Sequence, residues 1–118
     1  MQSLENIMLI TDLDGTLLPS SKEISAADAA AISQFRAKGG KFAIATGRTL
    51  QAAQRYLDRV QADVPVILFN GAGIYDPLSG TMLDTESLPA EAAFQMTRQV
   101  LEAFPEVSAE ILRADGTY

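Results

Sequence analysis

The chain has 118 residues, 47% of them hydrophobic and 20% charged, and this length suits one small domain rather than two. It contains neither cysteine nor histidine. Their absence excludes disulfides, thiolate chemistry and cysteine-ligated metal, and leaves acid–base work to carboxylates, lysine, tyrosine or metal-bound water. The net charge of −6 argues against nonspecific nucleic-acid binding, because such binding depends on phosphate neutralisation by lysine and arginine.

The N-terminal segment predicts neither a signal peptide nor a membrane span. It has no basic region, and two aspartates follow its apolar run directly. No apolar run in the sequence approaches the length needed to cross a membrane. We therefore expect no membrane partner and a cytoplasmic location.

Three apolar segments predict buried strands of a parallel sheet. They lie at residues 7–10, 41–46 and 65–69, where apolar residues run almost continuously. Such runs are typical of strands that are covered on both faces.

Two helices are predicted between these strands. The first begins after Ser25, a capping residue, and ends at Gly39-Gly40. The second follows Thr49, after which apolar residues recur at helical spacing. The alternation of strands and helices predicts an α/β fold with a Rossmann-like, doubly wound parallel sheet.

After the third strand the pattern changes. We expect a hairpin over residues 73–83 with its turn at 76–80, a helix over 89–104, a short strand over 107–112 and a turn at Asp115-Gly116. Four large apolar side chains in helical segments are expected to lie in the core rather than at a site: Phe35, Phe94, Met96 and Phe104.

Polar clusters that contain glycine follow all three predicted strands. They are Asp12–Thr16, Thr46–Arg48 and Asn70–Ala72. In sheets of this kind, ligands bind outside the carboxyl ends of the strands. The three clusters therefore predict one site at this end of the sheet.

Asp12 and Asp14 are the residues with the clearest chemistry. In an extended strand their side chains point to the same side, and two such carboxylates repel unless a divalent cation or a shared proton intervenes. Aspartate is also a competent nucleophile towards phosphorus. Gly15 allows a tight turn whose amides could cradle phosphate oxygens. For an isolated DxDG motif, a strand-end turn with solvated acids is the simpler interpretation.

The motif here is longer. Residues 8–10, followed by DLDGTLL from Asp12 to Leu18, resemble the first signature of the haloacid dehalogenase-like (HAD) hydrolase superfamily. Thr46-Gly47-Arg48 resembles the second signature. Phe69 to Ala72, followed by a hairpin and a helix, resembles the Cof-type, sucrose-phosphate phosphatase-like branch, subfamily IIB.

The resemblance implies a Mg²⁺-dependent phosphatase that acts on a small phosphorylated metabolite, with a sugar phosphate as the expected class. Asp12 matches the nucleophile, which also binds the metal. Asp14 matches the general acid–base, whose main-chain carbonyl is a second metal contact. Thr46 matches the hydroxyl that holds a phosphoryl oxygen, an arrangement that agrees with phosphoryl transfer by positioning and charge neutralisation.

Further contacts to substrate or phosphate are expected from Gly15, Gly47, Arg48 and Asn70. For Arg48, an ion pair with a surface acid is an equal alternative. An asparagine before glycine, as at Asn70, is often turn chemistry only.

The resemblance also divides the chain. Residues 1–83 match the first half of the HAD core, and residues 84–118 match the beginning of an inserted α/β cap. Two family signatures are not found: a lysine that stabilises the aspartyl-phosphate and an acidic pair that completes the magnesium shell. Lys22, Lys38 and Lys41 precede or begin the second strand, which is not the family position of that lysine.

We therefore expect a fragment of a longer enzyme. An exposed sheet edge would favour a homodimer. Two alternatives to a working phosphatase stay open: a catalytically incomplete fragment that only folds and binds metal or phosphate, and a phosphoryl transferase of the phosphomutase type.

Overall fold

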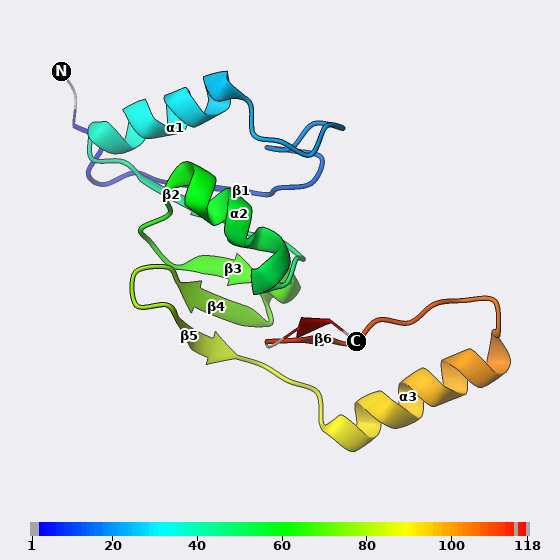
Figure 1. Cartoon of the computed structure of the whole chain (residues 1–118). Helices are drawn as coiled ribbons and strands as arrows, with labels where there is room; N and C mark the ends of the chain where they lie inside the picture. The colour runs from blue at the N-terminus through cyan, green and yellow to red at the C-terminus, as the bar shows by residue number, and fades with distance from the viewer. Residues whose placement is uncertain (1–2, 115, 118) are drawn as a thin grey trace.

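A computed structural model describes residues 3–114 and 116–117 and shows an α/β fold (Figure 1). The chain begins with three parallel strands, β1 (Met8–Thr11), β2 (Lys41–Ile44) and β3 (Val66–Leu68). β1 pairs with β2 along its whole length, and a parallel bridge between Ala45 and Ile67 joins β2 to β3. The predicted parallel sheet is confirmed, and each strand lies within its predicted range or extends one residue beyond it.

The two predicted helices, α1 (Ala26–Ala37) and α2 (Leu50–Val60), form the crossovers between these strands. Both predicted caps are confirmed: the Ser25 hydroxyl accepts a hydrogen bond from Asp28 N at 3.0 Å, and Thr49 does the same for Ala52 N at 3.2 Å. The helices contact each other, which places both on one face of the sheet. The described residues thus form one half of a doubly wound fold.

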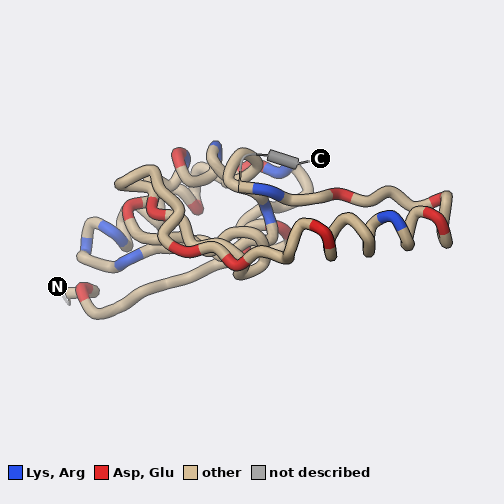
Figure 2. The backbone as a smooth tube through the Cα atoms, turned by 90° about the horizontal axis from the view of Figure 1, so that it is seen from below, with Lys and Arg blue, Asp and Glu red and all other residues tan. Residues whose placement is uncertain are grey.

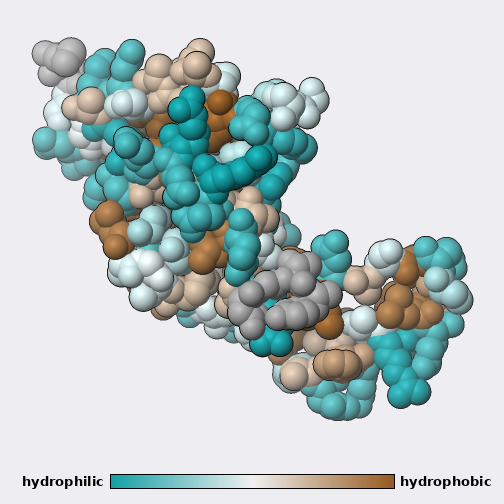
Figure 3. Space-filling view, viewed as in Figure 1, coloured by the Kyte–Doolittle hydropathy of each residue, from teal (hydrophilic) through white to brown (hydrophobic). Residues whose placement is uncertain are grey.

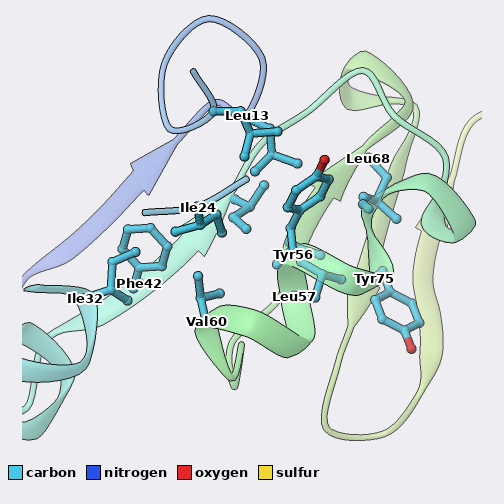
Figure 4. Packing of buried hydrophobic residues seen from close by; sticks show 13 residues of the cluster. Leu13, Ile24, Ile32, Phe42, Tyr56, Leu57, Val60, Leu68 and Tyr75 are labelled. Carbon is cyan, nitrogen blue, oxygen red and sulfur yellow. The ribbon is translucent and has the colours of Figure 1, made fainter. Parts of the chain in front are cut away.

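The core lies between these helices and the sheet (Figure 4). Its apolar side chains come from α1, α2, β2, β3, the residue Tyr75 that follows β3 in the sequence, and the loop between β1 and α1. Leu13, in that loop, is fully buried although aspartates flank it on both sides. Burial of a leucine side chain contributes about 1.5–3 kcal/mol. Leu13 therefore anchors the loop that presents Asp12 and Asp14.

A short 3₁₀ turn (Phe69–Gly71) leads from β3 into an antiparallel hairpin of β4 (Gly73–Asp76) and β5 (Thr81–Thr85). β4 pairs with β3, so the strand order continues β3-β4-β5. The predicted turn is confirmed, and the Asp76 carboxylate accepts hydrogen bonds from the amides of Leu78 and Ser79 within it.

The predicted helix over 89–104 is confirmed as α3 (Ala90–Ala103), but it buries no residue. Phe94, Met96 and Phe104 are more than half exposed, so their expected place in the core was wrong; Phe35, in α1, does pack against the core. Figure 3 shows hydrophobic atoms gathered over α3. Among the described helices and strands, none packs extensively against the apolar face of α3.

β1 also differs from expectation. Residues 7–10 are each about half exposed, between 47% and 52%, rather than buried on both faces. Among the described strands β1 has one neighbour, β2, so its other edge and much of its apolar surface lack a partner.

The predicted strand over 107–112 was wrong except at its end. Residues 105–111 have no regular strand structure, and β6 (Leu112–Arg113) pairs only with β7 (Gly116–Thr117). Residues 105–111 pair with none of the described strands. The predicted turn includes Asp115, which lies outside the described residues.

The molecule is elongated, with extents of 60 × 31 × 18 Å. Its radius of gyration is 17.2 Å, whereas a compact chain of this length is expected at about 13.5 Å. α3 projects away from the sheet and helices (Figure 1). None of the described helices combines the length and the apolar character that a membrane crossing requires.

Candidate active site

An open cavity of about 460 Å³ lies at the carboxyl ends of β1, β2 and β3. Six of the predicted site residues line it: Asp12, Asp14, Thr46, Gly47, Arg48 and Asn70. Gly15 does not line it, although it shapes the loop beside it. The three polar clusters, which are far apart in the sequence, thus meet at one place in the structure.

The loop after β1 presents both aspartates. Gly15 adopts φ +76°, a left-handed conformation that favours glycine, and lets the chain reverse directly after Asp14. The returning segment then bonds back to the strand end, with Leu18 N donating to Leu13 O at 2.8 Å. Asp12 Oδ1 accepts a hydrogen bond from Leu13 N at 2.8 Å, which orients its carboxylate. Asp12 is therefore held in place from within its own loop.

Asp14 lies between two cations. Arg48 binds it with both ends of its guanidinium, Nε to Oδ2 at 2.8 Å and Nη2 to Oδ1 at 2.9 Å. Lys22 Nζ lies 2.8 Å from Oδ1. The hydrogen bonds from Arg48, and then those from Lys22, hold the pKa of Asp14 well below its usual range. The pKa of Arg48 is raised for the same reason.

Of the two expected partners for Arg48, the structure shows an exposed acid, Asp14, which is itself one of the predicted site residues. The guanidinium of Arg48 also lies over the ring of Tyr56, 5.1 Å from its centroid. Its side chain is 25% exposed, so one part of it still faces the cavity and solvent.

The ends of β2 and β3 are bound to each other. Asn70 N donates to Thr46 O, and Phe69 N donates to Arg48 O, both at 3.1 Å. Asn70 has φ +55°, which asparagine tolerates better than most residues. A Cβ atom at Gly47 would lie 2.6 Å from Asn70 Oδ1, so a larger residue at this position would displace the Asn70 side chain from its place. Asn70 thus combines turn geometry with a place in the cavity wall.

Thr46 is almost completely buried, and its hydroxyl accepts a hydrogen bond from Arg48 N at 3.2 Å. A hydroxyl that accepts one hydrogen bond keeps its own hydrogen for another acceptor. Thr46 therefore has the geometry of a donor to an oxygen in the cavity.

The residues that could hold a metal are few. Within the part of the chain that the structure describes, no three aspartate or glutamate side chains lie close enough to hold a metal ion together. Asp12 keeps one carboxylate oxygen that its bond to Leu13 N does not use. A divalent cation would find part of an oxygen shell here and would need further ligands.

Sequence reasoning missed several residues of the site. Thr49 and Ala52, from the start of α2, line the cavity, and so do Glu110 and Leu112 from the segment after α3. Gln51 Nε2 holds this segment through a hydrogen bond to Ala114 O at 3.1 Å. No spacing in the sequence indicates such a contact.

The contact of Lys22 with Asp14 was not predicted either, because the position of Lys22 in the sequence does not match that of the family lysine. The sequence offered one indication of this contact: Lys22 lies in the loop that begins at Asp12. A loop that begins at the site and folds back can bring a later residue to the same site.

Comparison with known proteins gives the class of the chain. A sequence profile of the haloacid dehalogenase-like hydrolases matches residues 9–118. The chain belongs to this family.

The curated relatives that match carry phosphatase names. The chain is 30% identical over 95 residues to the pyridoxal phosphate phosphatase YbhA of Escherichia coli (strain K12), covering 80% of this chain and 35% of the relative. It is 34% identical over 93 residues to the 5-amino-6-(5-phospho-D-ribitylamino)uracil phosphatase YwtE of Bacillus subtilis (strain 168), covering 75% and 32%. The chain thus spans about a third of the length of these curated relatives.

Solved structures agree. The HAD-superfamily phosphatase BT1666 from Bacteroides thetaiotaomicron is 27% identical, with a TM-score of 0.75 over 94% of this chain and 40% of that one. The subclass IIB sugar phosphatase BT4131 has the same TM-score at 24% identity, which shows likeness of fold. These matches confirm the predicted fold class and the predicted family.

Proposed function

We propose that this chain is the N-terminal part of a magnesium-dependent phosphatase, which hydrolyses a small phosphorylated metabolite through an aspartyl-phosphate. The observation that supports it most is the meeting of Asp12, Asp14 and Thr46 around one cavity. The phosphatase names of the relatives support the same reaction class. In this proposal residues 1–83 belong to the catalytic core and residues 84–118 begin a cap.

The chemistry requires two steps. In the first, a carboxylate oxygen of Asp12 attacks phosphorus, the bond from phosphorus to the substrate oxygen breaks, and Asp14 gives that oxygen a proton. In the second, Asp14 takes a proton from a water molecule, whose oxygen attacks phosphorus and releases Asp12 and inorganic phosphate. Thr46 donates a hydrogen bond to a phosphoryl oxygen in both steps.

The surroundings of Asp14 suit the second step as they stand. Arg48 and Lys22 favour its ionised form, which is the form that accepts a proton from water. Proton donation in the first step requires these contacts to weaken. A phosphate group that enters beside Arg48 competes with Asp14 for the guanidinium. This competition would weaken the contact between Arg48 and Asp14 when substrate binds.

Magnesium, when bound, neutralises charge on the phosphoryl oxygens. Asp12 would hold it through its carboxylate and Asp14 through its main-chain carbonyl. The described residues supply no third acidic ligand beside these two, so this chain would hold the ion incompletely. The remaining ligands are expected from the two thirds of the relatives' length that the chain does not span.

A cavity of this size suits a metabolite rather than a macromolecule. A sugar phosphate stays the expected substrate class, and a cytoplasmic location stays a prediction. The incomplete metal shell favours one alternative in particular, a fragment that folds and binds phosphate or metal without turnover.

Phosphate release from a generic aryl phosphate with magnesium tests the proposal, with the wild-type chain compared to Asp12→Asn. We expect the wild-type chain to release phosphate and the variant to fall to the rate of a protein-free control, because the amide cannot attack phosphorus. Asp84→Asn makes the same chemical change on the exposed strand β5 and should leave the rate unchanged. Equal rates for the wild-type chain and Asp12→Asn would contradict the proposal for this chain and support the inactive fragment.

A further inference from the structure

Lys22 has an unusual backbone. Its φ of +58° lies in the left-handed region, which costs energy for any residue with a Cβ atom. A residue stays in such a conformation only when its surroundings impose it, and strain of this kind is concentrated at functional sites. The contacts around Lys22 must therefore stabilise this left-handed backbone conformation.

Two residues of α2 hold the backbone of Lys22 in place. Its carbonyl oxygen accepts two hydrogen bonds, from the hydroxyl of Tyr56 and from Arg55 Nη2, both at 3.0 Å. Tyr56 is one of the most deeply buried side chains of the core, and Arg55 is in turn hydrogen-bonded to its hydroxyl. The backbone at Lys22 is thus fixed to the rigid part of the molecule.

The consequence of this anchoring is the direction of the side chain. Lys22 Nζ reaches Asp14 Oδ1 at 2.8 Å, while Arg48 holds the same carboxylate from another element of the fold. Two cations from separate segments, the loop after β1 and the loop between β2 and α2, restrict rotation of the carboxylate more than either does alone. The side chain of Lys22 is half exposed, so this contact is not a requirement of burial.

We propose that Lys22 is a positioning residue, which fixes the carboxylate of Asp14 for proton transfer together with Arg48. This inference rests on the proposed function, in which Asp14 is the general acid–base. It assigns Lys22 no contact with substrate. It also explains the left-handed backbone at Lys22, because this conformation directs the Lys22 side chain towards Asp14.

The first test examines the contact itself and needs no turnover. The sequence has three lysines, Lys22, Lys38 and Lys41, whose rates of reductive methylation can be compared by peptide mass spectrometry. We expect Lys22 to react several-fold more slowly than the other two, because its amine is engaged by Asp14. In Asp14→Asn this difference should disappear. Equal rates in the wild-type chain would overturn the proposal.

The second test examines the role. Lys22→Met should lower kcat about tenfold with KM unchanged, because a poorly held acid–base group slows chemistry more than binding. Lys22→Arg should restore most of the rate, and Lys38→Met is the matched control at a lysine that does not contact Asp14. An unchanged kcat in Lys22→Met, or a loss confined to KM, would overturn the proposal.

Lys22→Gly separates positioning from folding. Lys22→Met and Lys22→Gly both lose the ion pair with Asp14, but glycine accepts the positive φ without strain, so Lys22→Gly should unfold at the same temperature as Lys22→Met or higher while its kcat is equally low. A kcat that recovers together with the unfolding temperature in Lys22→Gly would identify the role as structural and overturn the proposal. If the wild-type chain shows no turnover at all, the proposed function fails, and the methylation rates still decide whether Lys22 holds Asp14.

Discussion

Asp14 shows how much of a residue's chemistry comes from its neighbours. Its motif marks it as a site residue, but the motif does not reveal that Arg48 and Lys22 both bind its carboxylate. Arg48 follows Thr46 at the end of β2, so its arrival at the site follows from the predicted topology. The arrival of Lys22 depends on the path of one loop, which no periodicity describes.

The contacts of Asp14 should make stability depend on pH. They lower the pKa of Asp14 in the folded chain below its unfolded value of 3.8, so the ionised carboxylate stabilises the fold at pH values above 3.8. This stabilisation decreases as the pH falls below that value, because protonation then disfavours the folded state more than the unfolded one. We therefore expect Asp14→Asn to unfold at a lower temperature than the wild-type chain at neutral pH, and the difference to shrink on acidification.

Thermal unfolding of both proteins between neutral pH and about pH 2 measures this effect. The difference will be small, since Asp14 is exposed and ion pairs at the surface contribute little. Glu106→Gln, in the exposed segment after α3, controls for the loss of one charge. A difference that stays constant or grows at low pH would contradict the assignment.

At the scale of elements, α2 links stability to the site. Its buried face, which includes Leu57 and Val60, packs into the core, while its first turn forms part of the cavity wall. The cap at Thr49 fixes where the helix begins and therefore where Arg48 leaves the strand end. Capping residues and helical spacing are local signals, which is why sequence reasoning placed both α1 and α2 correctly.

Thr49→Ala should destabilise the chain by about 1 kcal/mol, because the amide of Ala52 then loses its acceptor. Thr49→Ser keeps the hydroxyl and should lose much less. Urea unfolding of the two variants and the wild-type chain gives the comparison. Equal losses in both variants would show that packing of the threonine methyl group, and not capping, determines the effect.

At the scale of the whole molecule, two apolar surfaces lack partners among the described residues: the exposed face of α3 and the strand β1. Charge does not offset this, since acidic and basic positions are interspersed along the backbone without one dominant patch (Figure 2). Self-association is expected at β1 rather than at α3, because β1 has a free edge among the described strands. Residues 7–10 are also four consecutive apolar residues without a charge.

A homodimer through β1 stays a prediction. Leu9→Lys should shift the chain towards monomer in light scattering, because a charge on an edge strand opposes pairing. Leu83→Lys, on the strand at the opposite edge of the sheet, should leave the oligomeric state unchanged. A chain that is monomeric and folded before any substitution would contradict the dimer.

The sequence by itself determined the helices, their alternation with parallel strands and the end of the sheet at which the site lies. These features follow from local signals, namely apolar periodicity, capping residues and glycine after a strand. The tertiary structure alone decided that β1 and α3 are exposed and that residues 107–111 form no strand. It also decided that Lys22 reaches Asp14 and that Glu110 lines the cavity. Exposure, strand pairing and side-chain contacts all depend on which distant segment of the chain packs against a residue. A side chain is buried or bound only where another part of the chain contacts it.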